Sequence, residues 1–564
     1  MRGTKDQAER LGRWCGFVAE PASGHACTGE HNLPGETVEG GDQKESSRNR
    51  GAAAGFKRRS AESRGEGELK LADLAKEIGA SAATGQLDRE ARDVTHDSRK
   101  CEPGSVFVAI RGEKSDARDF IPQAVERGAI AIVSGVALSN EDVPAWIQVA
   151  DSRAALAKAA AAVHGHPSER LKLVGVTGTN GKTTTAHLID SIIRVSEGTS
   201  AMFGTITHRI GDEDAAALNT TPEASDIQRM LARAVEAGCR SAVMEVSSHA
   251  IELHRADALK FAVAVFTNLT RDHLDYHKDM ESYFSAKEKL FTGALGSQPS
   301  ASVINVDDEY GRRLFRTAKG DRMTYGFGSR SDVGTDDFKL SARGLEFTVS
   351  TPAGKIDIRS RLVGRFHVYN ILAAFAAGLA LGAGLEEIAR GVAECSTVSG
   401  RFEQVSLNGS REAPFTVIVD YAHTDDALKN VLETAREVAG NEGRVVTVFG
   451  CGGDRDRTKR EPMGEIAGQL SDVAIVTSDN PRTEDPEAII GDIEPGLKRA
   501  GRPYLKMTDR REAIFRAVDE ARDGDVVLIA GKGHETYQII GAERNHFDDH
   551  EVAREAMMKR LGSE

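Results

Sequence analysis

The stretch that most constrains the fold runs from Leu171 to Val195 and has the pattern of a strand, a glycine-rich loop and a helix. Leu171 to Val176 is an apolar run typical of a buried strand, and His187 to Val195 has the spacing of an amphipathic helix. Backbone N–H groups of such a loop turn toward an anion, the Lys182 ammonium suits the β- and γ-phosphates, and the Thr183 hydroxyl suits Mg²⁺. The sequence therefore predicts a nucleotide-binding loop, made of Gly178, Thr179, Asn180, Gly181, Lys182, Thr183 and Thr184.

The glycines of this loop depart from the strict phosphate-loop pattern G-x-x-x-x-G-K-[ST]. Val176 stands where the pattern has its first glycine, and glycines stand instead at Gly175 and Gly178. A glycine-rich turn with a chance Gly-Lys-Thr is the alternative interpretation. The order of strand, loop and helix favours nucleotide binding.

Bulk properties exclude several classes of protein. The 564 residues are enough for about three or four domains. A net charge of -13 argues against a nucleic-acid partner, and no apolar run approaches the roughly 18 residues of a membrane span. The six scattered cysteines have no metal-ligand spacing and indicate reduced thiols in a cytoplasmic protein.

Composition and periodicity divide the chain into four parts. Residues 1–66 are rich in Gly, Ser, Arg and Glu and predict a disordered extension, although a wrongly assigned start explains them equally well. A small α/β unit is expected over 67–169, and alternating strands and helices over 170–398 predict a mostly parallel sheet. Within that part, 338–362 favours an antiparallel excursion. A second α/β unit is expected over 399–564.

Two strands of the central unit end in candidate metal or phosphate ligands. Glu245 ends the strand Ser241–Val246 and is well placed for Mg²⁺, the alternative being a solvated glutamate. His273 follows the strand Phe261–Asn268 and is a candidate for metal or phosphate contact, the alternative being a polar surface histidine.

Lys287 stands out on the predicted helix Glu281–Phe291. Together with Tyr283, Leu290 and Phe291 it falls on one otherwise apolar face. From spacing alone, a lysine that snorkels to solvent is the favoured interpretation.

Three polar loops follow strands of the C-terminal unit, at Gly450–Arg457, Ser478–Asp485 and Gly531–Glu535. Arg455 stands where a dinucleotide fingerprint needs its last glycine, so NAD binding is rejected. Arginine forks suit carboxylates and acidic groups suit an ammonium, so the sequence predicts a receptor for a zwitterionic amino acid. Mutually paired surface charges are the alternative. The side chains concerned are Arg455, Asp479, Asn480, Arg482 and Glu535.

These motifs together resemble the Mur ligase family over roughly residues 69 to 564. The family's G-T-N-G-K-T is present as Gly178–Thr183, which explains the glycine register. The segments E-V-S-S-H-A, T-N-L-x-R-D-H-L-D, D-Y-A-H and D-S-R stand at Glu245–Ala250, Thr267–Asp275, Asp420–His423 and Asp97–Arg99.

The resemblance implies an α/β fold of three domains. These are a small N-terminal domain that binds a UDP-sugar, a central P-loop ATPase-like domain with a parallel sheet, and a C-terminal Rossmann-like domain that binds an amino acid. It further implies ATP-dependent amide-bond formation with Mg²⁺, in a cytoplasmic enzyme expected to be a monomer.

The resemblance also assigns roles to residues. ATP contacts are expected at the loop residues 178–184 and at Asp420 and His423. Lys287 falls at the lysine that the family carries as a carbamate, which joins Thr183 and Glu245 in binding metal, while Lys182 and His273 complete the catalytic set. The UDP-MurNAc-peptide contacts are expected at Ser98, Asn219, Thr220, Thr221, Ser247 and Arg255.

The segment Asp479-Asn480-Pro481-Arg482 matches the family branch that adds meso-diaminopimelate to UDP-MurNAc-L-Ala-D-Glu. Diaminopimelate has a second carboxylate that lysine lacks, and Arg482 is suited to it. Arg455, Gly531 and Glu535 match further positions for the incoming amino acid. A lysine-adding relative, a folylpolyglutamate-type ligase and a nucleotide-binding regulatory protein are the alternatives.

A few positions depart from the family pattern. His367 stands where asparagine is usual, and Asp425 replaces a usual proline. Ala117 and Leu253 also differ from the common residues, which bears on the detail of the sugar-peptide site.

Overall fold

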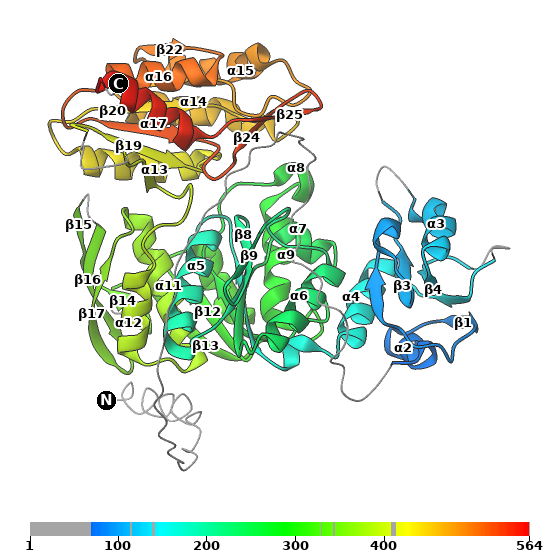
Figure 1. The fold of residues 1–564 in the computed structure, drawn as a ribbon. Coiled ribbons are helices and arrows are strands. Elements are labelled where there is room, and N and C mark those ends of the chain that lie inside the picture. The colour runs from blue at the N-terminus through cyan, green and yellow to red at the C-terminus, as the bar shows by residue number, and fades with distance from the viewer. Residues whose placement is uncertain are drawn as a thin grey trace, which may run out of the picture. The chain divides into compact units, whose positions relative to one another are not determined.

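The computed structural model describes residues 69–112, 116–137, 142–328, 330–341, 344–407 and 413–562. The extension predicted for residues 1–66 lies outside these ranges. The described chain is a mixed α/β protein whose strands form sheets of five, twelve, six and two strands (Figure 1). None of its described helices is long and apolar enough to cross a membrane.

The five-stranded sheet has the order β1-β5-β4-β3-β2, in which only β1 is antiparallel to its neighbour. The alanine-rich helix α4 packs its small side chains into the same core as β3 and β4. The elements are α2 (Leu71–Glu77), β1 (Ala82–Gly85), β2 (Asp93–Thr95), β3 (Ser105–Ala109), α3 (Ile121–Glu126), β4 (Ala129–Ser134), β5 (Ala145–Gln148) and α4 (Ser152–Val163).

The twelve-stranded sheet has a parallel centre, β7-β10-β6-β11-β12-β13-β14, in which β6 and β11 are nearly continuous apolar runs. Such runs are typical of strands that are covered on both faces. The elements of this centre are β6 (Lys172–Thr177), α5 (Lys182–Glu197), β7 (Ala201–Phe203), α6 (Ala224–Glu236), β10 (Ser241–Glu245), α7 (Ser248–Glu252), β11 (Phe261–Phe266), α8 (Leu274–His277), α9 (Met280–Thr292), β12 (Ala301–Asn305), α10 (Glu309–Thr317), β13 (Asp321–Phe327) and β14 (Val333–Thr335).

Antiparallel strands extend this sheet at both edges. The predicted excursion is confirmed, because β16 and β17 pair antiparallel over seven residue pairs. The other edge, β8 and β9, was not predicted from the sequence. The remaining elements of this part are β8 (Thr207–Ile210), β9 (Glu213–Ala216), β15 (Lys339–Ser341), β16 (Gly344–Thr351), β17 (Gly354–Ser360), α11 (Arg365–Leu381) and α12 (Leu385–Glu394).

The six-stranded sheet has the order β18-β19-β23-β20-β21-β22 and is parallel except for β18. Two apolar clusters fill its two faces. The elements are β18 (Glu403–Gln404), β19 (Thr416–Asp420), α13 (Asp425–Ala439), β20 (Val445–Phe449), α14 (Arg460–Leu470), β21 (Val473–Val476), α15 (Pro486–Ala500), β22 (Tyr504–Lys506), α16 (Arg510–Glu520), β23 (Val526–Ala530), the hairpin β24 (Tyr537–Ile540) and β25 (Glu543–His546), and α17 (Asp549–Arg560).

The boundaries predicted after 169 and 398 fall between these sheets and remain predictions. The start predicted for one helix was wrong, and the other element boundaries named above differ from the structure by one or two residues. Helix α5 begins at Lys182, five residues before the expected start at His187. Its first turn is polar because Thr183, Thr184 and Thr185 face the loop and its neighbours rather than the apolar core.

Candidate active site

The phosphate loop connects β6 to α5 and depends on two glycines with positive φ. Gly178 has φ 150° and Gly181 has φ 84°. A Cβ atom on Gly178 would stand 1.9 Å from Thr267 Oγ1, and one on Gly181 would stand 2.3 Å from Asn370 Oδ1. Both positions therefore require glycine for space as well as for conformation.

The loop is fixed by the segment that follows β11. Thr179 N donates to Asn268 O at 2.9 Å, and Asn180 N donates to Asn268 Oδ1 at 2.9 Å. Thr267 Oγ1 and Asn268 Nδ2 both donate to Asn180 O. These bonds hold the loop in one conformation.

Lys182 lies across the mouth of its own loop. Its Nζ donates to Gly178 O at 3.1 Å and to Thr179 O at 2.8 Å. Burial lowers the pKa of Lys182, against the opposing effect of Glu245 and Asp272. Because its acceptors are backbone carbonyls, the ammonium is free to exchange them for phosphate oxygens.

Glu245 and Thr183 meet at the start of α5. Glu245 is fully buried, and its Oε2 accepts from Thr183 Oγ1 at 3.0 Å. Its Oε1 accepts from Thr205 N at 2.7 Å. A buried carboxylate beside a hydroxyl at a phosphate loop has the oxygen ligands that Mg²⁺ prefers. No three described His, Cys, Asp or Glu side chains form a metal-binding group by themselves.

Lys287 does not snorkel. Its side chain is 2% exposed, and its Nζ donates to Gly178 O at 2.8 Å while lying 4.5 Å from the centre of the Tyr283 ring. Burial holds the pKa of Lys287 well below its usual range, and the neighbouring Lys182 charge lowers it further. The neutral amine, which reacts with CO₂, is therefore favoured.

A cavity of about 610 Å³ lies at the phosphate loop, and the two predicted histidines, His273 and His423, line it. His273 has φ 56° and its Nε2 is 3.3 Å from Asp272 Oδ2. Burial lowers the pKa of His273 to about 3 and that of His423 to about 4, so both rings are neutral at pH 7. Asp420 accepts from Phe402 N and Ala422 N, and burial raises its pKa to about 6.

Sequence reasoning missed Arg401, which lines this cavity. Its Nη2 donates to Thr183 Oγ1 at 3.1 Å, and its guanidinium lies 4.5 Å from the centre of the Tyr421 ring. Arg401 lies between α12 and β18, in a loop with no periodicity to draw notice. A cation at the hydroxyl of the phosphate loop suits the charge of a nucleotide.

The residues expected at the sugar-peptide substrate fall into two groups. Thr220, Thr221, Ser247 and Arg255 lie near Glu245, since Thr221 Oγ1 donates to Glu245 O at 2.8 Å and Arg255 Nη1 donates to Thr221 O at 3.1 Å. Asn219 is exposed beside them in sequence. Ser98 follows β2 of the five-stranded sheet, and its Oγ donates to Gln123 Oε1 at 2.7 Å.

The three loops predicted to bind the amino acid lie at the carboxyl ends of β20, β21 and β23. Arg482 has φ 52° and its Nη1 donates to Gly453 O at 2.8 Å, which joins the first two loops. Asn480 Nδ2 donates to Glu535 Oε2 at 2.8 Å, which joins the second to the third. Arg455 is exposed and Asp479 is buried, with Pro481 between Asn480 and Arg482 and Gly531 next to Asp479.

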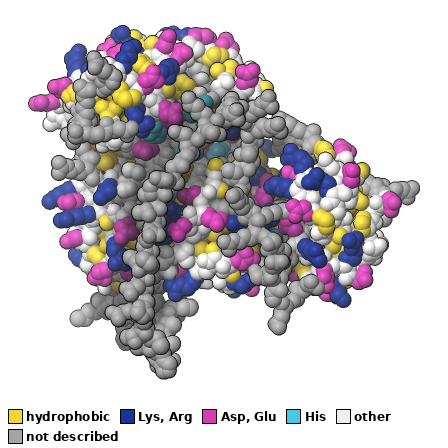
Figure 2. Space-filling model, viewed as in Figure 1, with side chains coloured by type: hydrophobic (Ala, Val, Ile, Leu, Met, Phe, Trp, Pro, Cys, Tyr) yellow, Lys and Arg dark blue, Asp and Glu magenta, His cyan; other side chains and the backbone are white. Residues whose placement is uncertain are grey.

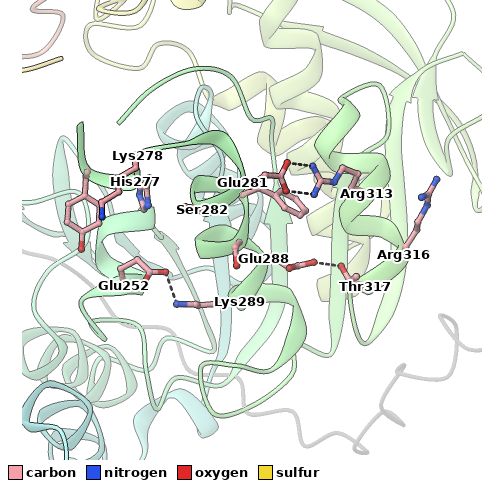
Figure 3. A pocket seen from close by; sticks show the side chains of 13 residues that line it. Glu252, His277, Lys278, Glu281, Ser282, Glu288, Lys289, Arg313, Arg316 and Thr317 are labelled. Atoms are coloured by element: carbon pink, nitrogen blue, oxygen red, sulfur yellow. Dashed lines mark hydrogen bonds and ion pairs between the residues drawn. The ribbon is translucent and has the colours of Figure 1, made fainter. Parts of the chain in front are cut away.

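A groove of about 970 Å³ lies elsewhere, between α9 and α10 (Figure 3). Glu281 binds Arg313 with two bonds of 2.7 Å, and Glu288 accepts from Thr317. Its charges are largely satisfied within the chain, so it is a weaker site than the cavity at the phosphate loop. On the face in Figure 2, Lys and Arg are interspersed with Asp and Glu over the described residues.

Comparisons with known proteins match three parts of the chain to one family. Family models described as "Mur ligase family, catalytic domain", "Mur ligase middle domain" and "Mur ligase, glutamate ligase domain" match residues 90–164, 176–378 and 400–533. A UDP-N-acetylmuramoyl-L-alanyl-D-glutamate–2,6-diaminopimelate ligase of Geobacter metallireducens is 47% identical, and the match covers 86% of this chain and 97% of the relative. The chain belongs to the Mur ligase family.

A second relative, the diaminopimelate ligase of Solibacter usitatus, is 48% identical over 83% of this chain and 94% of its own length. Among solved structures, a diaminopimelate ligase of this Mur family is 32% identical with a TM-score of 0.62 and covers 88% of this chain and 100% of that one. The predicted family and α/β fold are thus confirmed. A folylpolyglutamate synthase of Mycobacterium tuberculosis shares the fold at 18% identity and TM-score 0.53, over 72% of this chain and 95% of that one.

Proposed function

We propose that the chain is an ATP-dependent ligase that joins meso-diaminopimelate to the D-Glu γ-carboxylate of UDP-MurNAc-L-Ala-D-Glu. The observation that carries the proposal is the presence of both a phosphate loop held by Asn268 and the D-N-P-R loop at Arg482, in a chain whose relatives are named for this reaction. ATP and the two substrates are those of cytoplasmic precursor synthesis, so we place the enzyme in the cytoplasm. A monomer stays a prediction.

The first half of the reaction belongs to the phosphate loop. Lys182 and Arg401 bind and orient the γ-phosphate, and the γ-carboxylate attacks its phosphorus while ADP leaves. The product is an acyl phosphate. Thr183, Glu245 and a carbamate on Lys287 would hold Mg²⁺, which neutralises charge on the transferred phosphoryl group when bound. The fit rests on the buried Glu245 carboxylate and on the buried Lys287 amine, whose pKa burial holds well below its usual range.

The second half belongs to the C-terminal loops. The diaminopimelate amine attacks the acyl carbon, a tetrahedral intermediate forms, and phosphate leaves as the amide is made. Arg482 would bind the distal carboxylate and Glu535 the ammonium beside it. Because these loops and the phosphate loop belong to different sheets, movement that brings them together is expected in the catalytic cycle.

Phosphate release tests the proposal directly. The chain is incubated with ATP, Mg²⁺ and UDP-MurNAc-L-Ala-D-Glu, and with meso-diaminopimelate or L-lysine as acceptor. Release that needs diaminopimelate and is not supported by lysine is expected. Equal rates with the two acceptors would remove the role given to Arg482, and release that instead needs a folate together with L-glutamate would favour the folylpolyglutamate-type reaction.

A further inference from the structure

Lys532 is a fully buried lysine in the loop that follows β23. Its Nζ lies 3.1 Å from Asp479 Oδ1, donates to Asn480 Oδ1 at 3.1 Å and donates to Tyr537 O at 2.8 Å. Its hydrogen bonds thus go to Asn480 and Tyr537, and its charge is paired with Asp479. With no exposed surface, Lys532 has no atom left to contact a substrate.

The partners of Lys532 fix the orientation of the Asn480 side chain. Asn480 Oδ1 accepts from Lys532 Nζ and also from Ile539 N at 2.9 Å. Two donors at one end of the amide require oxygen there, so the NH₂ group must face the opposite way. At that end Nδ2 donates to Glu535 Oε2 at 2.8 Å.

Stability alone is a poor reason for this arrangement. A buried ion pair gains little net stability, because the loss of hydration offsets the attraction between its charges. Burial on its own would raise the pKa of Asp479, but Lys532 and Arg510 outweigh it and keep the pKa below its ordinary value. The charge is therefore maintained in a loop where amino-acid recognition is proposed.

We propose that Lys532 is a positioning residue for the amino-acid site, which holds the Asn480 amide so that Nδ2 faces Glu535 and directs the Glu535 carboxylate toward the incoming ammonium. The inference rests on the proposed function, since it concerns the same site. Lys532 also joins the D-N-P-R loop to the β24–β25 hairpin, because its Nζ donates to Tyr537 O, which lies on β24. Gln538 Nε2 donates to Asp479 O at 2.7 Å and reinforces that connection.

Three variants and one control separate positioning from folding. K532M removes the donor, K532R keeps the charge, and the double variant K532M/D479N removes both charges so that no buried carboxylate is left unpaired. K506M is the control, because Lys506 is a partly exposed lysine on β22 of the same sheet that pairs with Glu487. KM values for diaminopimelate, ATP and UDP-MurNAc-L-Ala-D-Glu are measured for each protein, together with its unfolding temperature.

For K532M and for the double variant, KM for diaminopimelate is expected to rise by about 10- to 100-fold, as for the loss of one hydrogen bond to a charged group. KM for ATP should stay within about twofold of wild type, and K532R should recover part of the loss. A folded double variant with unchanged KM for diaminopimelate, or with all three KM values raised equally, would overturn the inference.

The wild-type protein separates this result from the proposed function. If wild type does not use diaminopimelate, the proposed function falls. The same KM comparison is then made with the amino acid that does support phosphate release, so the role of Lys532 is decided independently.

Discussion

Gly181 and Gly198 make a matched pair of residues for testing the phosphate loop. Their φ values are 84° and 87°, but a Cβ on Gly181 would meet Asn370 at 2.3 Å, whereas one on Gly198 would meet no atom within 4 Å. G181A should lower kcat/KM for ATP by at least about 100-fold, because the loop must shift. G198A adds only backbone strain of about 1–3 kcal/mol, away from the loop, and should keep its activity. Steady-state kinetics with varied ATP checks both, and equal losses would contradict the steric argument.

The carbamate proposed on Lys287 can be tested by substitutions on helix α9. K287A should abolish phosphate release, because the buried amine that carries the carbamate is gone, and a short carboxylic acid added to the assay should restore part of it. Lys289, two residues along α9, is half-exposed and paired with Glu252 at 2.6 Å. K289A is therefore expected to remain active. Full activity of K287A without any additive would rule out the carbamate.

Elements with continuous apolar runs were predictable, and those without them were not. The strands β6, β20 and β23 stand out because they are buried on both faces. The edge strand β9 was missed because three of its four residues are exposed, and every residue of β25 is exposed as well. Their pairing is decided by neighbouring strands rather than by their own side chains.

The site was predictable where chemistry is concentrated in a motif. The phosphate loop and the D-N-P-R loop follow strands at the expected edges, and Glu245 is the last residue of its strand. Arg401 and Lys532 were missed because their roles depend on partners 218 and 52 residues away in the chain. Spacing alone also favoured a snorkelling Lys287, since the carbonyl of Gly178 that receives it cannot be seen in the sequence of α9.

Helix α17 is held to β18 by a charged contact that depends on pH. His550 Nε2 lies 2.8 Å from Glu403 Oε2 and Nδ1 lies 3.4 Å from Asp548 Oδ1. Burial would lower the pKa of His550, but the two carboxylates outweigh it and raise the pKa to about 9. The folded pKa exceeds the unfolded value of about 6.5, so this stabilisation is complete below pH 6.5 and is lost as pH rises toward 9.

H550Q should therefore lower the unfolding temperature at pH 6. Between pH 6.5 and 9, the unfolding temperature of H550Q should decrease less steeply with pH than that of wild type. The maximum slope removed is about 1.4 kcal/mol per pH unit. Thermal unfolding followed by circular dichroism over this range provides the measurement. H546Q is the control, because His546 is exposed and its pair with Glu551 is screened by solvent. The same pH profile in H550Q and wild type would contradict the assignment.

At the scale of the whole molecule, the phosphate loop and the loop after β11 each contact helix α13. Asn180 Nδ2 donates to Asp426 Oδ2 at 2.9 Å, and Arg271 Nη2 lies 3.1 Å from Asp425 Oδ2. Proline, which the resemblance predicts at position 425, has no carboxylate to pair with Arg271. The Asp425 carboxylate gives this chain an ion pair between its central and C-terminal parts.

A double-mutant cycle with R271A and D425A should give a coupling of about 0.2–1 kcal/mol, because both side chains are partly exposed. The coupling should shrink when salt is raised from 0.05 to about 1 M, since the screening length falls. Unfolding temperatures of the four proteins at the two salt concentrations measure it. A coupling that is indifferent to salt would show that the pair does not act through charge.

One oxygen atom, the Gly178 carbonyl, accepts from both Lys182 and Lys287. Nucleotide phosphates that draw Lys182 away change the charge next to the Lys287 amine, so nucleotide affinity and CO₂ uptake must influence each other by the same factor. Dissociation constants for a non-hydrolysable ATP analogue, measured with and without bicarbonate, should therefore differ, and K287A should abolish the difference. With the carbamate proposed on Lys287, dissolved inorganic carbon would act on this chain as a second effector, whose binding would rise and fall with the supply of nucleotide.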